Sequence, residues 1–245
     1  MSNTFFQFRE FTVHQEHCAM KVTTDGCLFG AWVADDLQSQ ENLTGKLLDI
    51  GTGTGLLSLM IAQKTKKEII GIEIDMAAAG QAKENAKRSP WEQRLHIIHM
   101  DIEDFYPAYP HQFKSIISNP PFYENELVSP SQQKNTAHHS IHLRITGLLK
   151  IIQSLLEPGG QFYLLLPYKR FEEAKGLVIK NKMSLSQVML VRQSPDHDYF
   201  RVFIKGINTP TPGQPVIKEE MSIRDRDKNY TAAFTRLLKD YYLSC

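Results

Sequence analysis

The stretch of sequence that decides the fold is Leu47-Leu48-Asp49-Ile50-Gly51-Thr52-Gly53-Thr54-Gly55. A short apolar run leads directly into glycines spaced G-x-G-x-G, and an apolar helical pattern follows. Glycines let the main chain turn tightly and let a ligand approach where a Cβ would collide. Loops that seat a pyrophosphate use the spacing G-x-G-x-x-G, whereas Leu56 takes the place of the final glycine here. The stretch therefore predicts a strand, a loop and a helix that bind a nucleoside without a pyrophosphate.

Acidic residues end this strand and the next one along the chain. Asp49 stands directly before the glycine turn, where its carboxylate suits an ammonium group such as that of methionine. Glu73 lies near the end of the next apolar run, 22 residues after Gly51, and is followed by Ile74. A carboxylate at about this distance accepts hydrogen bonds from ribose hydroxyls in nucleotide-binding folds. We therefore expect both acids, with Ile74 beside the second, to contact a nucleoside cofactor.

A third acid, Asp101, follows the apolar run at residues 95–100. We expect its carboxylate to accept a hydrogen bond from an adenine amine, while Ile102 packs on the ring. Ligands of open α/β sheets bind outside the carboxyl ends of the strands. The glycine loop, Glu73 and Asp101 together thus predict a site for S-adenosylmethionine. A helix N-cap or a solvated loop acid is the alternative for each carboxylate.

Around the glycine loop, short apolar runs alternate with helical patterns. The runs predict strands at residues 46–50, 68–74, 95–100, 115–118 and 161–166, and the patterns predict helices at 56–63, 76–87, 143–156 and 171–180. Residues 185–192 and 200–206 are expected to form a closing antiparallel pair. Parallel neighbours need long crossovers, which helices supply. We therefore predict an α/β fold of the Rossmann-like type: a seven-stranded, mainly parallel sheet with helices on both faces and a reversed last strand.

Length and composition favour one domain. The 245 residues are 42% hydrophobic and 22% charged. We expect a leader at 1–45, a core at 46–207 and a tail at 208–245, and the tail begins with the proline-rich stretch 208–215. The sequence has no apolar stretch of the roughly 18 residues that a membrane helix needs, and its start does not resemble a secretory signal. Its 3 cysteines, odd in number and widely spaced, argue against a disulfide framework or a zinc site. We expect a cytoplasmic monomer.

Charge is distributed unevenly along the chain. Residues 1–164 carry 14 Lys and Arg against 18 Asp and Glu, a net −4, while residues 165–245 carry 14 against 9, a net +5. A phosphate backbone, if one is bound, is expected along the C-terminal segment, although solvated helix faces explain the charge equally well. The candidate phosphate contacts are Arg192, Arg201 and Lys205, with Lys169, Arg170, Arg224, Arg226 and Lys228 as further residues to test.

The segment Ser118-Asn119-Pro120-Pro121-Phe122-Tyr123 follows the fourth predicted strand and indicates the chemistry. An aromatic amine is a poor nucleophile because its lone pair is delocalised into the ring. If the Asn119 side-chain oxygen and the Pro120 carbonyl each accept one N–H of the amine, they aim its lone pair at a methyl donor. The prolines fix these acceptors in advance, and Phe122 would stack on the base. The alternative is a rigid Pro-Pro turn with a core phenylalanine.

These motifs resemble those of the Rossmann-like amino-methyltransferases, whose N-P-P-[FY] motif implies methylation of a planar-system nitrogen. The leader at residues 8–26, and the tail with Tyr230-Thr231, Phe234-Thr235 and 237–243, further resemble the bacterial valine-tRNA adenine methyltransferases. That resemblance covers nearly the whole chain. It implies N6-methylation of adenine-37, which adjoins the anticodon of tRNA(Val) on its 3′ side. It also implies that Lys21, Thr23 and Asp25 lie near the methionine end of the cofactor; a leader that simply packs on the sheet is the alternative. Asn119 is a further expected cofactor contact.

Other acceptors and other classes of protein stay open at this point. The same motif would serve a guanine N2 of ribosomal RNA, a DNA adenine or a protein glutamine amide. An NAD-dependent oxidoreductase would need a different glycine spacing, and a non-catalytic RNA-binding module would not need Asn119. His138, His139 and His142 lack a recognisable metal-ligand spacing and are expected in an active-site flap. We expect no metal.

Overall fold

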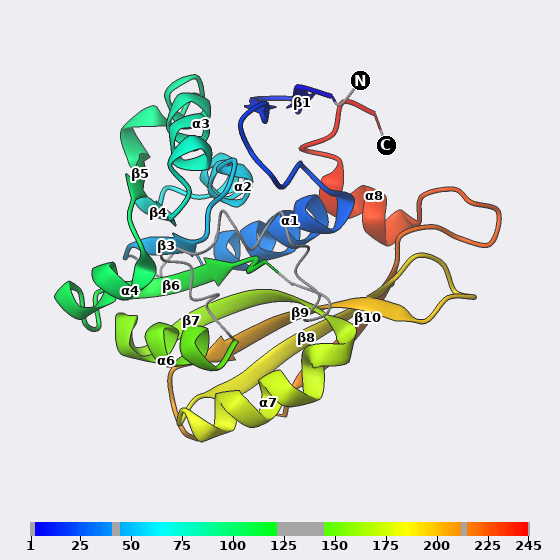
Figure 1. The fold of residues 1–245 in the computed structure, drawn as a ribbon. Helices are drawn as coiled ribbons and strands as arrows, with labels where there is room; N and C mark the ends of the chain where they lie inside the picture. The colour runs from blue at the N-terminus through cyan, green and yellow to red at the C-terminus, as the bar shows by residue number, and fades with distance from the viewer. Residues whose placement is uncertain (1–2, 41–44, 122–144, 212–214, 245) are drawn as a thin grey trace, which may run out of the picture.

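The computed structural model describes residues 3–40, 45–121, 145–211 and 215–244 (Figure 1). Its central sheet has eight strands in the order β10-β8-β9-β7-β6-β3-β4-β5. The strand β9 is antiparallel to both of its neighbours, and every other pairing in this sheet is parallel. The strands are β3 (Leu47–Ile50), β4 (Ile69–Glu73), β5 (Leu95–His99), β6 (Phe113–Ser118), β7 (Leu156–Pro167), β8 (Ser184–Arg192), β9 (Tyr199–Ile207) and β10 (Ile217–Ser222).

The predicted Rossmann-like α/β fold with a reversed closing strand is confirmed, but the sheet has one strand more than expected. The additional strand is β10, which pairs in parallel with β8 from Ile217 opposite Gln187 to Ser222 opposite Arg192. It lies in the segment that the sequence assigned to a tail. An edge strand needs little apolar surface, and Met221 is its one buried residue. Its polar sequence therefore gave no strand signal.

Helices cover both faces of the sheet (Figure 1). One helix lies in the leader, where the sequence predicted none: in α1 every residue from Gly26 to Ala34 is buried. A helix buried on nearly all sides lacks the apolar stripe by which surface helices are recognised. The helices are α1 (Thr24–Gln38), α2 (Leu56–Lys64), α3 (Met76–Lys87), α4 (Ile102–Phe105), α6 (Ile145–Leu155), α7 (Phe171–Lys180) and α8 (Ala232–Leu238), with short 3-10 turns η1 (Glu92–Arg94), η2 (Tyr106–Ala108) and η3 (Tyr168–Arg170).

Two apolar layers sandwich the sheet. Adjacent residues of β3 belong to different layers, Leu47 to the one that holds α1, α2 and α8 and Leu48 to the one that holds α6 and α7. This alternation follows from the period of two along a strand. Because both faces are covered, the central strands read as continuous apolar runs, which is why the sequence revealed them.

The two ends of the chain lie side by side (Figure 1). The strands β1 (Phe5–Gln7) and β2 (Thr12–His14) form a small separate sheet, and Arg9 N donates to Tyr241 O at 2.8 Å. Phe8 stacks on Phe11 with ring centroids 4.5 Å apart. These leader aromatics therefore pack inside the protein. Among the residues that the structure describes, none of the helices combines the length and apolar character that a bilayer span requires.

Candidate cofactor and acceptor site

One edge of the sheet collects most of the sequence-predicted motifs. The strands β3, β4, β5 and β6 run parallel, so their carboxyl ends share an edge. The glycine loop follows β3, Glu73 ends β4, Asp101 follows β5 and Asn119 follows β6. The register pairs Ile50 with Ser118, and Ser118 Oγ donates to Ile50 O at 2.8 Å. The glycine loop and the Asn-Pro-Pro segment therefore leave the sheet from paired positions on neighbouring strands.

The glycines of the loop adopt the left-handed backbone conformation. Gly51 and Gly53 have φ of 73° and 57°, and a Cβ added at either would meet no atom within 4 Å. Gly51 N and Thr52 N both donate to Ile72 O, at 2.9 and 3.0 Å, which pins the loop to β4. Backbone with positive φ beside open space is suited to close approach of a ligand.

Asp49 is fully buried below this loop. Its Oδ2 accepts hydrogen bonds from Thr52 Oγ1 at 2.6 Å and from Ser58 Oγ at 2.7 Å. Its Oδ1 is also buried but has no hydrogen-bond partner. Burial raises the pKa of Asp49 to about 6. A buried polar atom without a partner is rare, and an ammonium group is the kind of ligand that would satisfy a carboxylate oxygen. Thr52 and Ser58 were not among the expected site residues; their hydroxyls three and nine positions after the acid were the available signal.

Glu73 lies next to the glycine loop. Its Oε2 accepts from Gly53 N at 2.8 Å and its Oε1 accepts from Asp75 N at 3.0 Å. Each carboxylate oxygen has two lone pairs, so each can accept a further hydrogen bond. Ile74, which follows, is 49% exposed. An apolar side chain held open beside this acid fits the predicted nucleoside contact.

Asp101 takes the helix N-cap role, one of the two that the sequence left open. Its Oδ1 accepts from Glu103 N at 2.8 Å and so caps α4. The side chain remains half-buried at the carboxyl edge. Ile102 is 7% exposed and packs with Phe105 in the apolar layer of α6 and α7. The N-cap alternative therefore applies to one oxygen of Asp101.

The acceptor segment is described only in part. Asn119 is half-buried, Pro120 is buried and Pro121 is exposed. The remaining residues predicted for this region lie outside the described residues, namely Phe122, Tyr123, His138, His139 and His142. Within the described part of the chain, no group of three or more His, Cys, Asp or Glu side chains is arranged to hold a metal.

The leader residues lie where α1 begins. Thr23 caps the helix by accepting from Gly26 N at 3.2 Å, and Lys21 Nζ donates to Gln15 O. A Cβ added to Gly26 would lie 3.6 Å from Leu56 Cδ2, at the start of α2. The first turn of α1 therefore sits beside the helix that follows the glycine loop.

Asp25 and Arg201 form an ion pair, with Arg201 Nε 2.7 Å from Asp25 Oδ2. Arg192 donates through Nε to Ser222 Oγ at 3.0 Å and lies 3.6 Å from a carboxylate oxygen of Glu220. Both arginines lie at the carboxyl edge, because Arg201 pairs with Pro167 at the end of β7 and Arg192 ends β8. Asp25, predicted to contact the cofactor, and the two arginines, predicted to contact phosphates, therefore already have partners within the protein.

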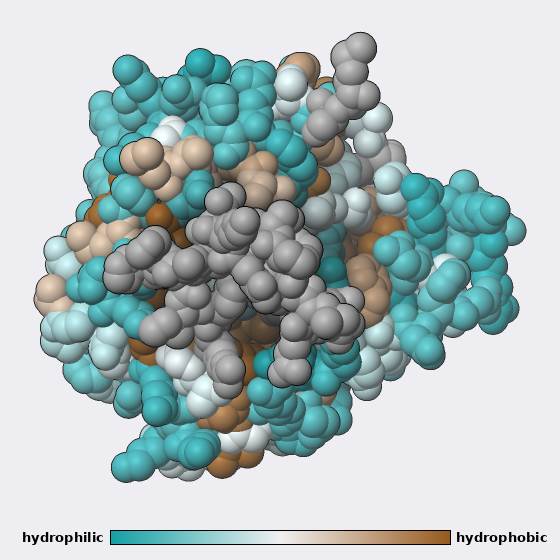
Figure 2. All heavy atoms as spheres, viewed as in Figure 1, coloured by the Kyte–Doolittle hydropathy of each residue, from teal (hydrophilic) through white to brown (hydrophobic). Residues whose placement is uncertain are grey.

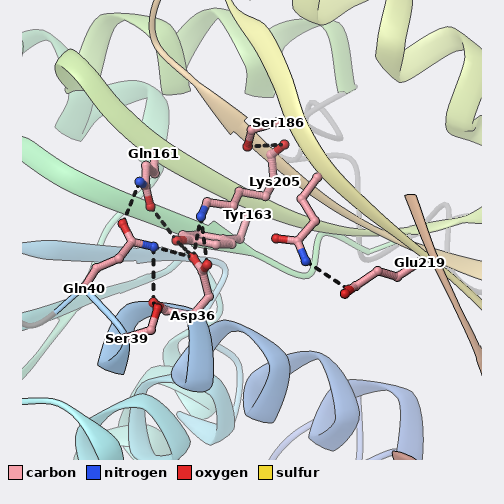
Figure 3. A network of polar contacts seen from close by, with 9 residues as sticks. Asp36, Ser39, Gln40, Gln161, Tyr163, Ser186, Lys205 and Glu219 are labelled. Atoms are coloured by element: carbon pink, nitrogen blue, oxygen red, sulfur yellow. Dashed lines mark hydrogen bonds and ion pairs between the residues drawn. The ribbon is translucent and has the colours of Figure 1, made fainter. Parts of the chain in front are cut away.

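Lys205 belongs to a polar network between α1 and the sheet (Figure 3). Its Nζ lies 2.7 Å from Asp36 Oδ2, which also accepts from Tyr163 OH at 2.6 Å. Burial and the Asp36 carboxylate raise the pKa of Tyr163 well above its usual value. The Lys205 side chain is 12% exposed. The register of β9 turns it toward α1, so a direct phosphate contact is disfavoured for this residue.

Further basic residues lie on a projection at the carboxyl edge, made of the turn 193–198 and the segment 223–231. Arg224 N donates to Gln193 O at 2.9 Å and Arg226 Nε lies 3.3 Å from Asp196 Oδ1, so the two parts are joined. The projection extends to the right of Figure 1, and its visible face in Figure 2 is hydrophilic. Its arginines are paired with acidic or main-chain groups of the projection itself.

This strand order, with the glycine loop and the Asn-Pro-Pro segment at one edge, defines a methyltransferase of the Rossmann-like class. Solved structures share the fold. A predicted O-methyltransferase from Agrobacterium tumefaciens aligns with a TM-score of 0.64 at 17% identity, covering 88% of this chain and 96% of its own. The magnesium protoporphyrin IX methyltransferase of Synechocystis, with bound SAM, aligns at 0.55 with 16% identity, covering 76% and 80%. The family model of the methyltransferase small domain matches residues 31–174.

The full-length sequence then identifies the family. The tRNA1(Val) (adenine(37)-N6)-methyltransferase of Bacteroides thetaiotaomicron is 38% identical over 245 residues, covering 99% of each chain. Proteins of the same name from Cytophaga hutchinsonii and Proteus mirabilis are each 35% identical, covering 100% of both chains in the first case and 97% of this chain and 93% of the relative in the second. The chain belongs to the family of tRNA1(Val) (adenine(37)-N6)-methyltransferases. The resemblance recognised in its leader and tail is thereby confirmed.

Proposed function

We propose that this protein uses S-adenosylmethionine to methylate N6 of adenine-37 in tRNA(Val). The observation that carries the proposal is the pairing of Ile50 with Ser118. It brings the start of the glycine loop and the start of the Asn-Pro-Pro segment to neighbouring strand ends. A methyl donor held by the first and an amine held by the second would then be adjacent. The family names support tRNA as the substrate.

The cofactor would be held from several strand ends. The unpartnered Asp49 Oδ1 suits the methionine ammonium, and the Glu73 carboxylate can accept from the ribose hydroxyls. Gly51 and Gly53 leave space above the loop. When bound, S-adenosylmethionine supplies a methyl group on a sulfonium. The remaining cofactor contacts that we propose are Lys21, Thr23, Asp25, Gly55, Ile74, Asp101, Ile102 and Asn119.

The acceptor adenine would be positioned by the Asn-Pro-Pro segment. The Asn119 amide oxygen and the Pro120 carbonyl each accept one N–H of the exocyclic amine, which directs the nitrogen lone pair toward the methyl group. Pro120 and Pro121 hold these acceptors before the substrate arrives, and preorganisation of this kind is a large term in catalysis. Phe122 and Tyr123 supply aromatic surface on which the base, once out of its stack, can rest. No general base is needed, because the amine loses its proton after transfer.

The RNA backbone would approach along the carboxyl edge. Arg192 and Arg201 lie there, and their guanidinium groups can contact phosphates while keeping one internal partner each, since a guanidinium carries five N–H donors. Lys205 is the weakest of the three predicted contacts, because Asp36 already engages its ammonium. A tRNA substrate implies that the protein works in the cytoplasm, and we propose that it does so as a monomer.

The proposal is tested by incubating the protein with labelled S-adenosylmethionine and total tRNA that lacks the modification. Digestion and mapping should locate the label in N6-methyladenosine at position 37 of tRNA(Val). Parallel reactions contain ribosomal RNA, duplex DNA and a glutamine peptide. Label in guanine N2, in DNA adenine or in the peptide would replace the proposed acceptor with another planar nitrogen. Cofactor binding without transfer to any of them would favour a non-catalytic RNA-binding module.

A further inference from the structure

Asn85 joins two segments of the cofactor site that are far apart in sequence. It lies on α3 and its side chain is 1% exposed. Its Nδ2 donates to His14 O at 2.8 Å and to Thr54 O at 2.9 Å, while its Oδ1 accepts from His14 N at 3.0 Å. Both amide N–H groups and the amide oxygen are therefore bonded to main-chain atoms. One side chain holds the leader and the glycine loop together.

The bond to Thr54 acts on the glycine loop. Thr54 stands between Gly53 and Gly55, and a Cβ added to Gly55 would lie 3.5 Å from Ala82 Cβ on the same helix. The helix α3 thus supports the loop by packing and by one hydrogen bond. The Gly53 amide is held separately, by Glu73.

The bonds to His14 act on the leader. His14 ends β2 and is followed by the buried Gln15, whose Oε1 accepts from Val22 N at 2.8 Å and whose carbonyl accepts from Lys21 Nζ. Hydrogen bonds at His14 and at the adjoining Gln15 therefore link Asn85 to the residues that precede α1. Because the Asn85 amide bonds to both the N–H and the C=O of His14, it also fixes the position of β2 along α3.

Between these bonds, the leader carries a buried cysteine. Cys18 is 5% exposed. Burial raises the pKa of the Cys18 thiol to about 11, and the Glu73 carboxylate acts in the same direction. The charge of the acid that we assign to the ribose is therefore felt within the segment 14–22.

We propose that Asn85 is a positioning residue that couples the leader to the glycine loop, so that cofactor binding at the loop also orders residues 14–22. The inference rests on the proposed function for the identity of the cofactor. A buried amide that bridges two main-chain segments leaves unpaired donors and acceptors when it is removed. Loss of the Asn85 amide should therefore disturb the leader and the glycine loop together. Packing alone would not link the two segments in this way.

Three variants of the full-length chain test this coupling. Asn85→Ala removes all three bonds. Asn85→Asp keeps the side-chain volume and the acceptor for His14 N, but sets a carboxylate against the carbonyls of His14 and Thr54. Ala86→Gly is the control: the next residue on α3 is also buried, and glycine weakens the helix by about 1 kcal/mol without touching these bonds. Urea unfolding of each variant measures the general loss of stability.

Hydrogen exchange followed by mass spectrometry, with and without S-adenosylmethionine, gives the decisive readout. In the wild type and in Ala86→Gly, the cofactor should slow exchange in both 51–55 and 14–22. In both Asn85 variants, exchange in 14–22 should be faster and should no longer respond to the cofactor. The Michaelis constant for the cofactor should rise about tenfold, a loss near 1.4 kcal/mol, with kcat changed much less.

Two outcomes would overturn the coupling. One is an exchange pattern in 14–22 that is the same in the wild type and in both Asn85 variants. The other is an Ala86→Gly variant that reproduces the Asn85 effects, which would reduce them to lost stability. A wild type that shows the coupled protection but methylates no tRNA would overturn the proposed function alone, so the two failures can be distinguished.

Discussion

Asp25 and Arg201, 176 residues apart in sequence, form an ion pair with an Nε to Oδ2 distance of 2.7 Å. The sequence assigned the acid to the cofactor and the arginine to the RNA. Their pairing ties the first turn of α1 to the start of β9, at the carboxyl edge where both ligands would meet. Each side chain is therefore a partner for the other as well as a candidate ligand contact.

A double-mutant cycle of Asp25→Ala and Arg201→Ala should reveal this pair. The side chains are 15% and 29% exposed, so the interaction is partly shielded from solvent. We expect a coupling free energy of about 1 kcal/mol from urea unfolding. Strictly additive effects of the two substitutions would show that the pair contributes nothing to stability.

Gly53→Ala should weaken cofactor binding more than it weakens the fold. The residue has φ of 57°, and an added Cβ meets no protein atom, so it would project into the space that we assign to the cofactor. Gly159→Ala is the matched control, with φ of 73° and equally open surroundings at the start of β7. Both variants should lose about 1 kcal/mol of unfolding free energy from the strained backbone. Calorimetric titration should show reduced cofactor affinity only for Gly53→Ala, and equal affinities would contradict the assignment.

Asp49 should make stability depend on pH. Burial raises its folded-state pKa to about 6, so its contribution to stability is fully present below about pH 4 and is lost as the pH rises through 6. Asp49→Asn carries no charge at any pH. The variant should therefore gain stability relative to the wild type between pH 4.5 and pH 8, by an amount on the order of 1–3 kcal/mol. Urea unfolding at the two pH values measures this gain, and a pH-independent difference would rule out the raised pKa.

Asn119→Ala should reduce turnover while cofactor affinity is largely kept. The amide oxygen is proposed to act on the acceptor amine, and loss of one preorganised contact of this kind typically costs about 100-fold or more in kcat. Single-turnover methylation of tRNA, with calorimetric titration of the cofactor alongside, separates the two effects. Unchanged turnover would remove Asn119 from the catalytic role.

Arg192→Ala should weaken tRNA binding. The slope of log binding constant against log salt concentration should fall in magnitude by about one, as expected for one lost phosphate contact. Lys46→Ala is the control, because Lys46 also pairs with a glutamate but precedes β3 at the opposite edge of the sheet. Binding isotherms at several salt concentrations would decide the matter. Equal slopes for the wild type and Arg192→Ala would exclude Arg192 from the RNA surface.

Local sequence was sufficient to predict those helices and strands whose apolar periodicity is complete within a short stretch of the chain. The helices α3 and α7 begin and end at the residues that the apolar period predicted, Met76–Lys87 and Phe171–Lys180. The glycine loop and the acids at the strand ends were likewise predictable, because a tight turn and the end of an apolar run are both encoded within a few neighbouring residues. For β10 and α1 the pattern failed, since one is a polar edge strand and the other is buried on nearly every side.

The sequence by itself determined the strand and helix alternation, the glycine turn over Asp49 and the rigid Asn-Pro-Pro segment after β6. The tertiary structure alone decided which side chains meet: Asp25 with Arg201, Asp36 with Lys205, and Asn85 with His14 and Thr54. The physical reason is the separation along the sequence between the residues that interact. Backbone conformation responds to neighbours within a few residues, whereas these charges and amides lie between 31 and 176 residues from their partners and gain them only when the sheet and helices have packed.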